Sequence, residues 1–413
     1  MLSNKYLGFT TFGESHGFGF GLVIEDVIPN IDFPFDALKT TLQKRKPNQS
    51  TFTTQRNETD DFEVISGLFK GKTTGLPICI LFKNNDIRTS DYDFLENTFR
   101  PAHADEAWFK KFKIYDYRGG GRASGRETIS RVAAGAYVQS LLGDIKITAY
   151  PIQIYNIHAI KKDLNYISSN PLCWPCPETY SSVTDLLEKI ASERDSVGGV
   201  VEVKIEQVPS GLGDPVFEKL DGNLSKAIMS IGGVKGIEFG EGFSLSNMKG
   251  SHANNNSKHG GIFGGVSNGD DIVMKIAVKP VPSIGLPGRH DVCLIPRILP
   301  VIVSMIQLVL SDAIAHQRLI SCEQPNLSVL REAIDKIDED ILIALFRRAE
   351  VVKQIKVYKT NNKLAIHDNQ REKLVMDNVL DLGGQLGLNS AFVNDIYDLI
   401  IGESKRMQGS PQD

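Results

Sequence analysis

The stretch CEQPNLSVLREAIDKID, residues 322–338, separates two kinds of sequence in this chain of 413 residues. Before Gln324-Pro325 the chain is punctuated by glycine and mixes strand-like with helix-like segments. After it, the sequence reads as helix almost to its end. A single domain rarely changes character so abruptly, and this length is sufficient for two. We therefore predict two domains, residues 1–322 and 326–413.

The composition is that of an ordinary globular protein, 41% hydrophobic and 23% charged, with a formal net charge of −4. Without a basic excess we expect no nucleic-acid partner, and an anion site would need locally concentrated cations. No uninterrupted apolar run reaches membrane-spanning length and the N-terminal segment lacks a signal-peptide core, so we expect no membrane partner. Five irregularly spaced cysteines are typical of a reducing compartment, which indicates a cytoplasmic location.

One cysteine pair, Cys173-Trp174-Pro175-Cys176, has the spacing of a redox dithiol or half a zinc site. It lies among prolines rather than at the start of a helix that follows a strand. No second pair follows at metal spacing. We interpret it as a surface loop with two bystander thiols, and we predict no metal site.

Residues 1 to about 322 alternate strand patterns with helical patterns in irregular order. This order predicts an α+β fold rather than a doubly wound sheet. The period-two strand candidates are Val197–Val208, Asp270–Val281 and Lys146–Ile157. The helix candidates are Asp36–Lys44, Glu127–Leu142, Ser181–Glu193 and Pro296–Gln317, the last a buried helix because it is apolar on most faces.

The tail predicts three helices, and Ser390 is the expected N-cap of the last one. Three helices cannot easily close a core alone, so we expect partner helices. The expected helices begin at Asn326, Asn369 and Ser390, and the expected breaks are Asn361-Asn362-Lys363, then Gly383-Gly384 and Gly387.

Two histidines and a glycine–arginine run form the first chemical pattern. His16 lies in FGESHG (residues 12–17) and His103 in RPAHAD (residues 100–105). The run YRGGGRASGRE (residues 117–127) leads into a predicted helix, where backbone N–H groups, the helix dipole and guanidinium groups can cradle an anion. A glycine-rich turn with solvated arginines explains this run equally well.

These segments, in this order, resemble the chorismate synthase family. The resemblance also rests on residues 53–56, on SGLFKGKTTGLPI (66–78) and on Gly288-Arg289-His290-Asp291 followed by Pro296-Arg297, and it covers nearly all of residues 1–320. It implies a β-α-β sandwich that forms tetramers and binds reduced FMN. The implied reaction converts 5-enolpyruvylshikimate 3-phosphate to chorismate by 1,4-anti elimination of phosphate and the C6 hydrogen.

The resemblance assigns roles to individual residues. His16 matches the general acid for the departing phosphate, His103 the histidine that sets the protonation of the flavin, and Asp291 the acid that assists proton removal from flavin N5. Arg45, Arg122 and Arg126 are candidates for clamping the substrate, because guanidinium pairs bidentately with phosphate and carboxylate. The implied cofactor-binding residues are Arg122, Ala123, Ser124, Gly232, Gly233, Gly264, Lys279, Pro280, Val281, Pro282, Ser283 and Arg289.

Two departures from the family pattern bear on the flavin and on a nicotinamide or extra phosphate contact, respectively. The loop Lys279–Pro287 is shorter than usual, which leaves an impaired flavin domain open as an alternative, and Thr51 stands where the family often has arginine. NADPH enters only indirectly, as a possible source of reducing equivalents, and a separate flavin reductase is a possible partner.

The tail carries a second pattern, in which Arg331 and Arg348 lie 17 positions apart on one predicted helix. Their Cα atoms are therefore about 25 Å apart. Both can grip one small ligand only if they come from different copies of the helix, packed antiparallel. For any one of these residues alone a solvated helix face with ion pairs is the simpler interpretation, and Asp368 is a good N-cap candidate.

As a set, the tail positions resemble the all-helical chorismate mutase family without a gap. The family implies a dimer of intertwined three-helix chains that rearranges chorismate to prephenate. The implied roles are carboxylate binding for Arg348 and for Arg331 from the partner chain, ether-oxygen contacts for Lys359 and Gln408, contacts with the ring hydroxyl for Glu372 and the Arg371 backbone, support of a carboxylate for Ser404, and substrate binding for Asp368.

Together the resemblances imply a bifunctional enzyme in which the first product is the second substrate, so that fusion raises its local concentration. We expect a homo-oligomer, a tetramer with paired mutase domains. One alternative is a synthase whose helical tail is a regulatory or oligomerisation module without catalysis. Another is an active mutase attached to an impaired flavin domain. A flavin or NADPH oxidoreductase is a third, but the dinucleotide fingerprint is lacking.

Overall fold

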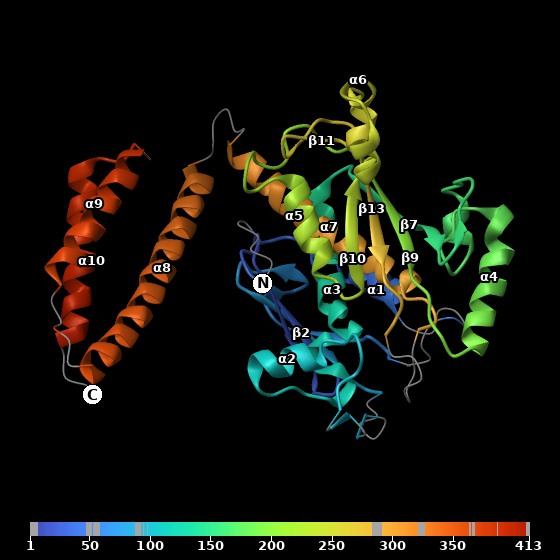
Figure 1. Cartoon of the computed structure of the whole chain (residues 1–413), viewed down its shortest axis with the longest axis horizontal. Coiled ribbons are helices and arrows are strands. Elements are labelled where there is room, and N and C mark those ends of the chain that lie inside the picture. The colour runs from blue at the N-terminus through green and yellow to red at the C-terminus, as the bar shows by residue number, and fades with distance from the viewer. Residues whose placement is uncertain are drawn as a thin grey trace. The chain divides into compact units, whose positions relative to one another are not determined.

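The computed structural model in Figure 1 describes residues 7–46, 52, 58–86, 92–93, 95–96, 98–282, 291–320, 327–362, 365, 368–385 and 387–409. The chain forms two compact units, Met1–Ser321 and Cys322–Asp413. The division falls beside Gln324-Pro325, where the sequence changes character.

The first unit is a sandwich of two antiparallel sheets with helices between them, which confirms the α+β expectation (Figure 1). One sheet has the order β1-β2-β6-β3 and the other β10-β13-β9-β7-β8. The strands are β1 Phe9–Gly13, β2 Gly19–Ile24, β3 Phe62–Ser66, β4 Leu68–Phe69, β5 Lys72–Thr73, β6 Ile78–Lys83, β7 Lys146–Ile154, β8 Ile157–His158, β9 Gly199–Glu206, β10 Val234–Phe239, β11 Ile262–Phe263, β12 Val266–Ser267 and β13 Ile272–Val278.

Several helices of this unit pack between the sheets: α3 packs on β2, α7 packs on β7 and β9, and α1 and α5 pack on α7. The helices are α1 Phe35–Arg45, α2 Asp105–Phe112, α3 Thr128–Val138, α4 Pro177–Ser192, α5 Leu220–Met229, α6 Gly250–Ala253 and α7 Ile295–Ile320. Short 3₁₀ turns are η2 Arg118–Ala123, η3 Gly125–Glu127, η4 Gln139–Leu142, η5 Tyr166–Ser169, η6 Gly242–Asn247 and η7 Asn256–His259.

The period-two pattern of the sequence corresponds to one buried face of the second sheet. Ile272, Met274, Ile276 and Val278 of β13 are all buried, while the residues between them are not. The alternation places every second side chain against the helices, because successive side chains of a strand point to opposite faces. The predicted strands near β7, β9 and β13 and the predicted helices near α1, α3, α4 and α7 are confirmed, with ends that differ by a few residues.

The helix α7 corrects the expectation about apolar length. Its segment Ile295–Arg318 is long and apolar enough to cross a membrane, with a mean hydropathy of 2.1. However, 67% of the most apolar window is buried inside the unit, where α3, α5 and strands of the second sheet pack around it. This is the pattern of a core helix, as the apolar sequence Pro296–Gln317 predicted.

The cysteine pair is not a surface loop, which corrects a second expectation. Trp174 and Cys176 are fully buried, and the Trp174 indole donates to Thr179 Oγ1 at 3.0 Å. Burial raises the pKa of the Cys173 thiol, so it is a poor nucleophile. Among the described residues both cysteines are free thiols and no group suits a metal ion.

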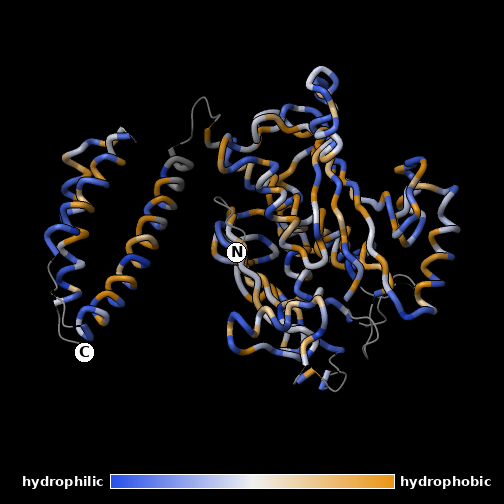
Figure 2. The backbone as a smooth tube through the Cα atoms, in the orientation of Figure 1, coloured by the Kyte–Doolittle hydropathy of each residue, from blue (hydrophilic) through white to orange (hydrophobic). Residues whose placement is uncertain are grey.

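The second unit consists of α8 Leu327–Asn361, α9 Asn369–Gln385 and α10 Ser390–Gly409, with α10 packed on the other two. Apolar residues recur along the whole of α8 (Figure 2). Two details of the predicted tail are wrong. The N-cap of α10 is Asn389, whose Oδ1 accepts from Ala391 N at 2.9 Å, and α9 continues through Gly383-Gly384, because Gly383 faces α10 where a Cβ would lie 2.9 Å from Val393 Cγ2.

Candidate functional site

A cavity of about 910 Å³ lies in the first unit where the end of β1, the 3₁₀ turns before α3, the start of β10, the end of β13 and the start of α7 converge. Its volume is in the range of small-molecule sites. The predicted residues that line it are His16, Arg45, His103, Arg122, Ala123, Ser124, Arg126, Gly232, Gly233, Lys279, Pro280, Val281, Pro282 and Asp291.

Three predicted cofactor residues are not among those lining it. Gly264 lies in the turn between β11 and β12, and its φ of +58° suits that turn. Ser283 and Arg289, like most of the shortened loop, lie outside the described residues.

The cavity concentrates positive charge, although the chain as a whole is negative. Four carboxylates line it, Glu58, Asp86, Glu127 and Asp291, against eight arginine and lysine side chains. These cations are Arg45, Arg100, Arg122, Arg126, Arg131, Lys235, Lys279 and Arg297. The cavity also has apolar lining residues, which are Met229, Ile231, Leu294, Ile298 and Val301.

His16 is buried, and its ring meets that of Tyr92 edge-on with centroids 5.0 Å apart. Gly119 packs directly against it, because a Cβ at that position would lie 2.0 Å from His16 Nδ1. Gly119, Gly120 and Gly121 have φ values of +59°, +80° and +51°, which side chains rarely tolerate. The three glycines therefore form a turn that residues with a side chain could rarely adopt, and this turn leaves room for the imidazole.

The arginines of this run are not simply solvated. Arg118 is exposed and pairs with Asp116, but Arg122 donates to Thr11 Oγ1 at 2.8 Å and Arg126 is buried. The helix α3 begins only at Thr128, beyond the run. The sequence interpretation as a turn is thus right for the glycines, while Arg122 and Arg126 face the cavity as an anion site requires.

His103 is held by a carboxylate. Its Nδ1 lies 2.6 Å from Asp105 Oδ1, and Arg100 contacts the same carboxylate through Nε at 2.8 Å. Burial alone would raise the pKa of Asp105, but His103 and Arg100 outweigh it and hold that pKa well below its ordinary value. Arg100 Nη2 also lies 3.0 Å from His103 Nδ1, so the carboxylate and the guanidinium together fix the orientation of the ring.

Two further contacts tie the predicted residues to the cavity wall. Asp291 Oδ2 accepts from Arg297 Nη1 at 2.6 Å. Lys279 Nζ donates to the carbonyl of Ala102 at 3.0 Å, beside His103. Burial, with help from Lys235, lowers the pKa of Lys279.

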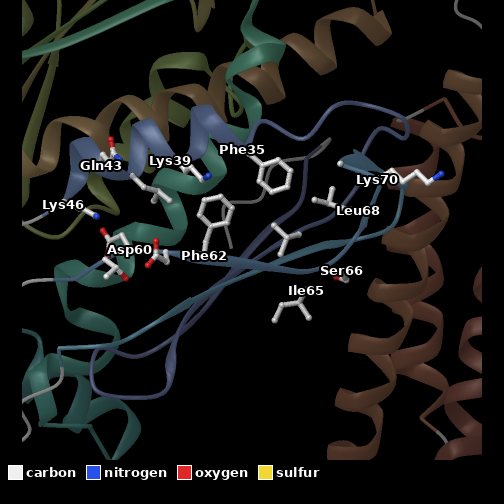
Figure 3. A pocket seen from close by; sticks show the side chains of 15 residues that line it. Phe35, Lys39, Gln43, Lys46, Asp60, Phe62, Ile65, Ser66, Leu68 and Lys70 are labelled. Atoms are coloured by element: carbon white, nitrogen blue, oxygen red, sulfur yellow. The ribbon is translucent and has the colours of Figure 1, made fainter.

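Sequence reasoning missed Asp60, Arg100 and Asp105. Asp60 lies behind the cations of the cavity, and it also lines a second cavity of about 640 Å³ between α1 and β3. Figure 3 shows Asp60 at one end of this second cavity and the rings of Phe35 and Phe62 along it. The only sequence signal was a pair of carboxylates, Glu58 and Asp60, beside the quoted family stretch.

In the second unit, α8 and α10 bring three predicted residues together. Arg348 of α8 donates to Ser404 Oγ of α10 and reaches the carbonyl of Ile400 at 3.5 Å. Gln408 donates to the Ser404 carbonyl at 3.2 Å, and its Oε1 is buried without a hydrogen-bond partner among the described residues. A cation, a hydroxyl and an amide therefore share one side of this helix pair.

The other predicted tail residues are placed differently. Glu372 of α9 pairs with Lys405 of α10 at 2.7 Å. Asp368 caps α9, since its Oδ1 accepts from Arg371 N at 3.0 Å, which is the simple interpretation of that residue. Arg331 is exposed near the start of α8, and Lys359 lies in its last turn. The structure thus does not bring Arg331 to Arg348 within one chain.

Comparisons with known proteins give the same division. The family model described as chorismate synthase matches residues 7–287, and the one described as chorismate mutase type II matches residues 330–409. A chorismate synthase of Syntrophus aciditrophicus (strain SB) is 42% identical over 341 residues, covering 76% of this chain and 96% of the relative. A chorismate synthase of Flavobacterium psychrophilum is 41% identical over 337 residues, covering 75% and 95%.

A solved structure is also similar. The chain described as a crystal structure of chorismate synthase superposes with a TM-score of 0.61 and 26% sequence identity. The similarity covers 81% of this chain and 98% of that chain.

Proposed function

The chain belongs to the chorismate synthase family and continues into a chorismate mutase type II region, and on that premise we propose that the cavity around His16 is the elimination site and the α8–α10 face is the rearrangement site. The protein is a bifunctional enzyme of the shikimate pathway. One observation supports the first assignment most directly: a single cavity gathers both predicted histidines and eight cations.

The elimination needs a proton donor and a cage of positive charge. The substrate carries a phosphate and two carboxylates, and the phosphate leaves with the electron pair of its C–O bond. His16, held against Gly119 and Tyr92, is the donor to this leaving group. Arg45 and Arg122 bind the anionic groups, and fixed guanidinium groups stabilise the charge that develops on the phosphate.

Members of this family need reduced flavin, and the residues of the cavity fit such a group. The apolar wall suits a planar ring system, and Gly232-Gly233 with Lys279–Pro282 would hold it beside the substrate. When bound, reduced flavin lends electron density to the substrate transiently, which no side chain can do. Asp105 and Arg100 fix the ring of His103 at the cavity wall, and Asp291 assists proton movement beside Arg297.

The rearrangement needs no nucleophile, only a compact substrate conformer and cations beside the breaking ether bond. Arg348, oriented by Ser404, binds one carboxylate, and Arg331 from a partner copy binds the other. Lys359 and Gln408 address the ether oxygen, while Glu372 and the Arg371 backbone bind the ring hydroxyl. The tail therefore acts as a pair of copies, within a homo-oligomer that we propose to be a cytoplasmic tetramer.

The decisive experiment is anaerobic incubation of the full chain with 5-enolpyruvylshikimate 3-phosphate and reduced FMN, with both products followed over time. We expect chorismate to form first and prephenate to follow. Chorismate that accumulates without prephenate would show that the tail is a regulatory module. Conversion of added chorismate without conversion of the first substrate would show an impaired flavin domain. Omitting NADPH and any flavin reductase tests that neither is needed once reduced flavin is supplied.

A further inference from the structure

Arg45 and Arg126 come from distant parts of the chain and share one carboxylate. Arg45 at the end of α1 donates through Nη2 to Asp60 Oδ2 at 2.6 Å. Arg126, in the turn before α3, donates through Nη1 to Asp60 Oδ1 at 2.5 Å. Each carboxylate oxygen thus holds one guanidinium group, and both arginines line the cavity that contains His16.

All three side chains are removed from solvent. The side chain of Asp60 is 0% exposed, that of Arg45 is 2% and that of Arg126 is 4%. Burial lowers the pKa of Arg45 to about 10 despite the favourable effect of Asp60. Burial alone would raise the pKa of Asp60, but the two arginines outweigh it and lower that pKa, so the carboxylate stays ionised. Glu58, whose side chain is also 0% exposed, lies 3.5 Å from Arg126, so two buried cations are balanced by two buried carboxylates in the cavity wall.

The surroundings fix Arg126 but leave Arg45 donor capacity. Arg126 also donates through Nε to Asn84 Oδ1 at 2.9 Å and lies 3.5 Å from Glu58. Arg45 Nε is buried and has no hydrogen-bond partner among the described residues. An orphaned buried donor beside a cavity is costly unless a ligand satisfies it.

The backbone of Asp60 is strained in a way that serves this contact. Its φ is +55°, in the left-handed region that few residues other than glycine, asparagine and aspartate adopt. It lies two positions before β3, and the next residue, Asp61, is exposed and lines the second cavity. The turn directs the carboxylate of Asp60, and not that of Asp61, to the two arginines.

We propose that Asp60 is a positioning residue that holds Arg45 and Arg126 side by side as one binding element for an anionic group of the substrate. This inference rests on the proposed elimination site. Asp60 does not touch the substrate; it sets the place and orientation of the two groups that do. The negative charge of Asp60 opposes binding of a highly anionic substrate nearby. The preorganised donors of the two arginines offset this unfavourable effect.

The variant Asp60→Asn separates positioning from simple charge. Asparagine tolerates the left-handed backbone and keeps one acceptor oxygen, so only one arginine keeps its partner. By charge alone, loss of an anion makes the cavity more positive and should tighten binding of 5-enolpyruvylshikimate 3-phosphate. By positioning, binding should weaken. We expect the dissociation constant from calorimetry and KM to rise at least about tenfold, with a smaller change in kcat.

The matched control is Asp61→Asn, which removes the neighbouring exposed carboxylate and should change binding by no more than about twofold. Thermal unfolding of each preparation, followed by circular dichroism, tests whether the first unit is folded as in the wild type. If Asp60→Asn is insoluble, Asp60→Glu replaces it, because it keeps the charge and displaces the carboxylate by one methylene; it should also weaken binding.

Binding by Asp60→Asn or Asp60→Glu that equals or exceeds that of the wild type overturns the inference while leaving the proposed function intact. Wild-type protein that neither binds nor converts the substrate overturns the proposed function, and this inference with it. The two failures are therefore distinguishable in one set of measurements.

Discussion

The two units of this chain differ in how much of their apolar surface they bury. In the first unit, strands and helices enclose a continuous core that includes Phe20, Phe82, Ile129 and Met305. In the second unit, among the side chains that the structure describes, only Val352 and Val393 are buried apolar residues. Ile334, Ile337 and Ile341, which lie along one stripe of α8, are 56%, 57% and 52% exposed.

The two units also differ in how their candidate sites are assembled. The cavity of the first unit gathers its histidines and arginines from one chain, although they are distant in the sequence. The second unit places Arg331 and Arg348 on the same straight helix, so one copy cannot close both on one small molecule. The proposed pairing of two copies would complete both the core and the site of this unit.

The largest expected effect comes from Arg348→Ala. Loss of this guanidinium should reduce prephenate formation about 10³-fold, because it removes a fixed charge that stabilises the transition state. Chorismate formation should stay near the wild-type rate, which a coupled assay of both products measures. The control is Arg347→Ala, since Arg347 is the adjacent exposed arginine. Loss of both activities together would contradict two separable sites.

His16→Ala tests the first unit in the opposite direction. Removing a general acid should slow phosphate elimination by about 10²- to 10⁴-fold, while turnover of added chorismate stays unchanged. Phosphate release from 5-enolpyruvylshikimate 3-phosphate under anaerobic conditions is the measurement. His158→Ala is the matched control, because His158 is exposed on β8. An unchanged elimination rate would exclude His16 as the donor.

Ile337→Asp tests whether the exposed apolar stripe of α8 becomes buried when two tails pair. A carboxylate in the apolar stripe of α8 should raise the dissociation constant of the paired tails at least about tenfold, because pairing would bury an uncompensated charge. The readout is specific mutase activity across a dilution series, with the elimination rate as an internal reference. Glu339→Gln, on the same helix and exposed, should behave as wild type. Activity independent of concentration in the Ile337 variant would argue for a site complete in one copy.

The smallest effect concerns the two glycines of α9. Gly383→Ala should destabilise the tail by about 1–3 kcal/mol, because the added methyl meets Val393 at 2.9 Å. Gly384→Ala meets nothing within 4 Å and should stabilise the helix by about 0.5–1 kcal/mol. Urea unfolding followed by far-UV circular dichroism gives both free energies. If both variants changed the free energy of unfolding equally, or if Gly384→Ala were the destabilising one, the close packing of α9 on α10 would be contradicted.

How much the sequence could predict depended on the range of the interaction. Local periodicity predicted β9, β13, α1 and α7, because the side-chain pattern of one segment decides which face is buried. Most of the site residues that the family resemblance predicted in the first unit do line the cavity. The N-cap Asn389 was missed by one position, because serine and asparagine are both good caps and only the backbone shows which oxygen faces the N–H groups.

Contacts between residues that are far apart in the sequence could not be predicted from it. Asp60 meets Arg45 and Arg126 across 15 and 66 positions of sequence, and nothing local shows that one carboxylate serves both. Gly119 reads as a turn residue, whereas its contact with His16 depends on how β1 and the turn before α3 come together. The Gly383-Gly384 pair reads as a break, but close packing on α10 requires the first of these glycines within a continuous helix.

The position of α7 at the end of the first unit has a consequence for biosynthesis. It is the central apolar helix, yet it is the last element of its unit to leave the ribosome. The sheets are therefore synthesised before the helix that packs between them. The 93 residues that follow it in this sequence take about 5 to 20 s to translate. Translation of the tail thus gives the nascent first unit a period in which α7 can insert between the sheets. A chain stopped at residue 320 would lose that interval and release its most apolar helix at the moment of emergence.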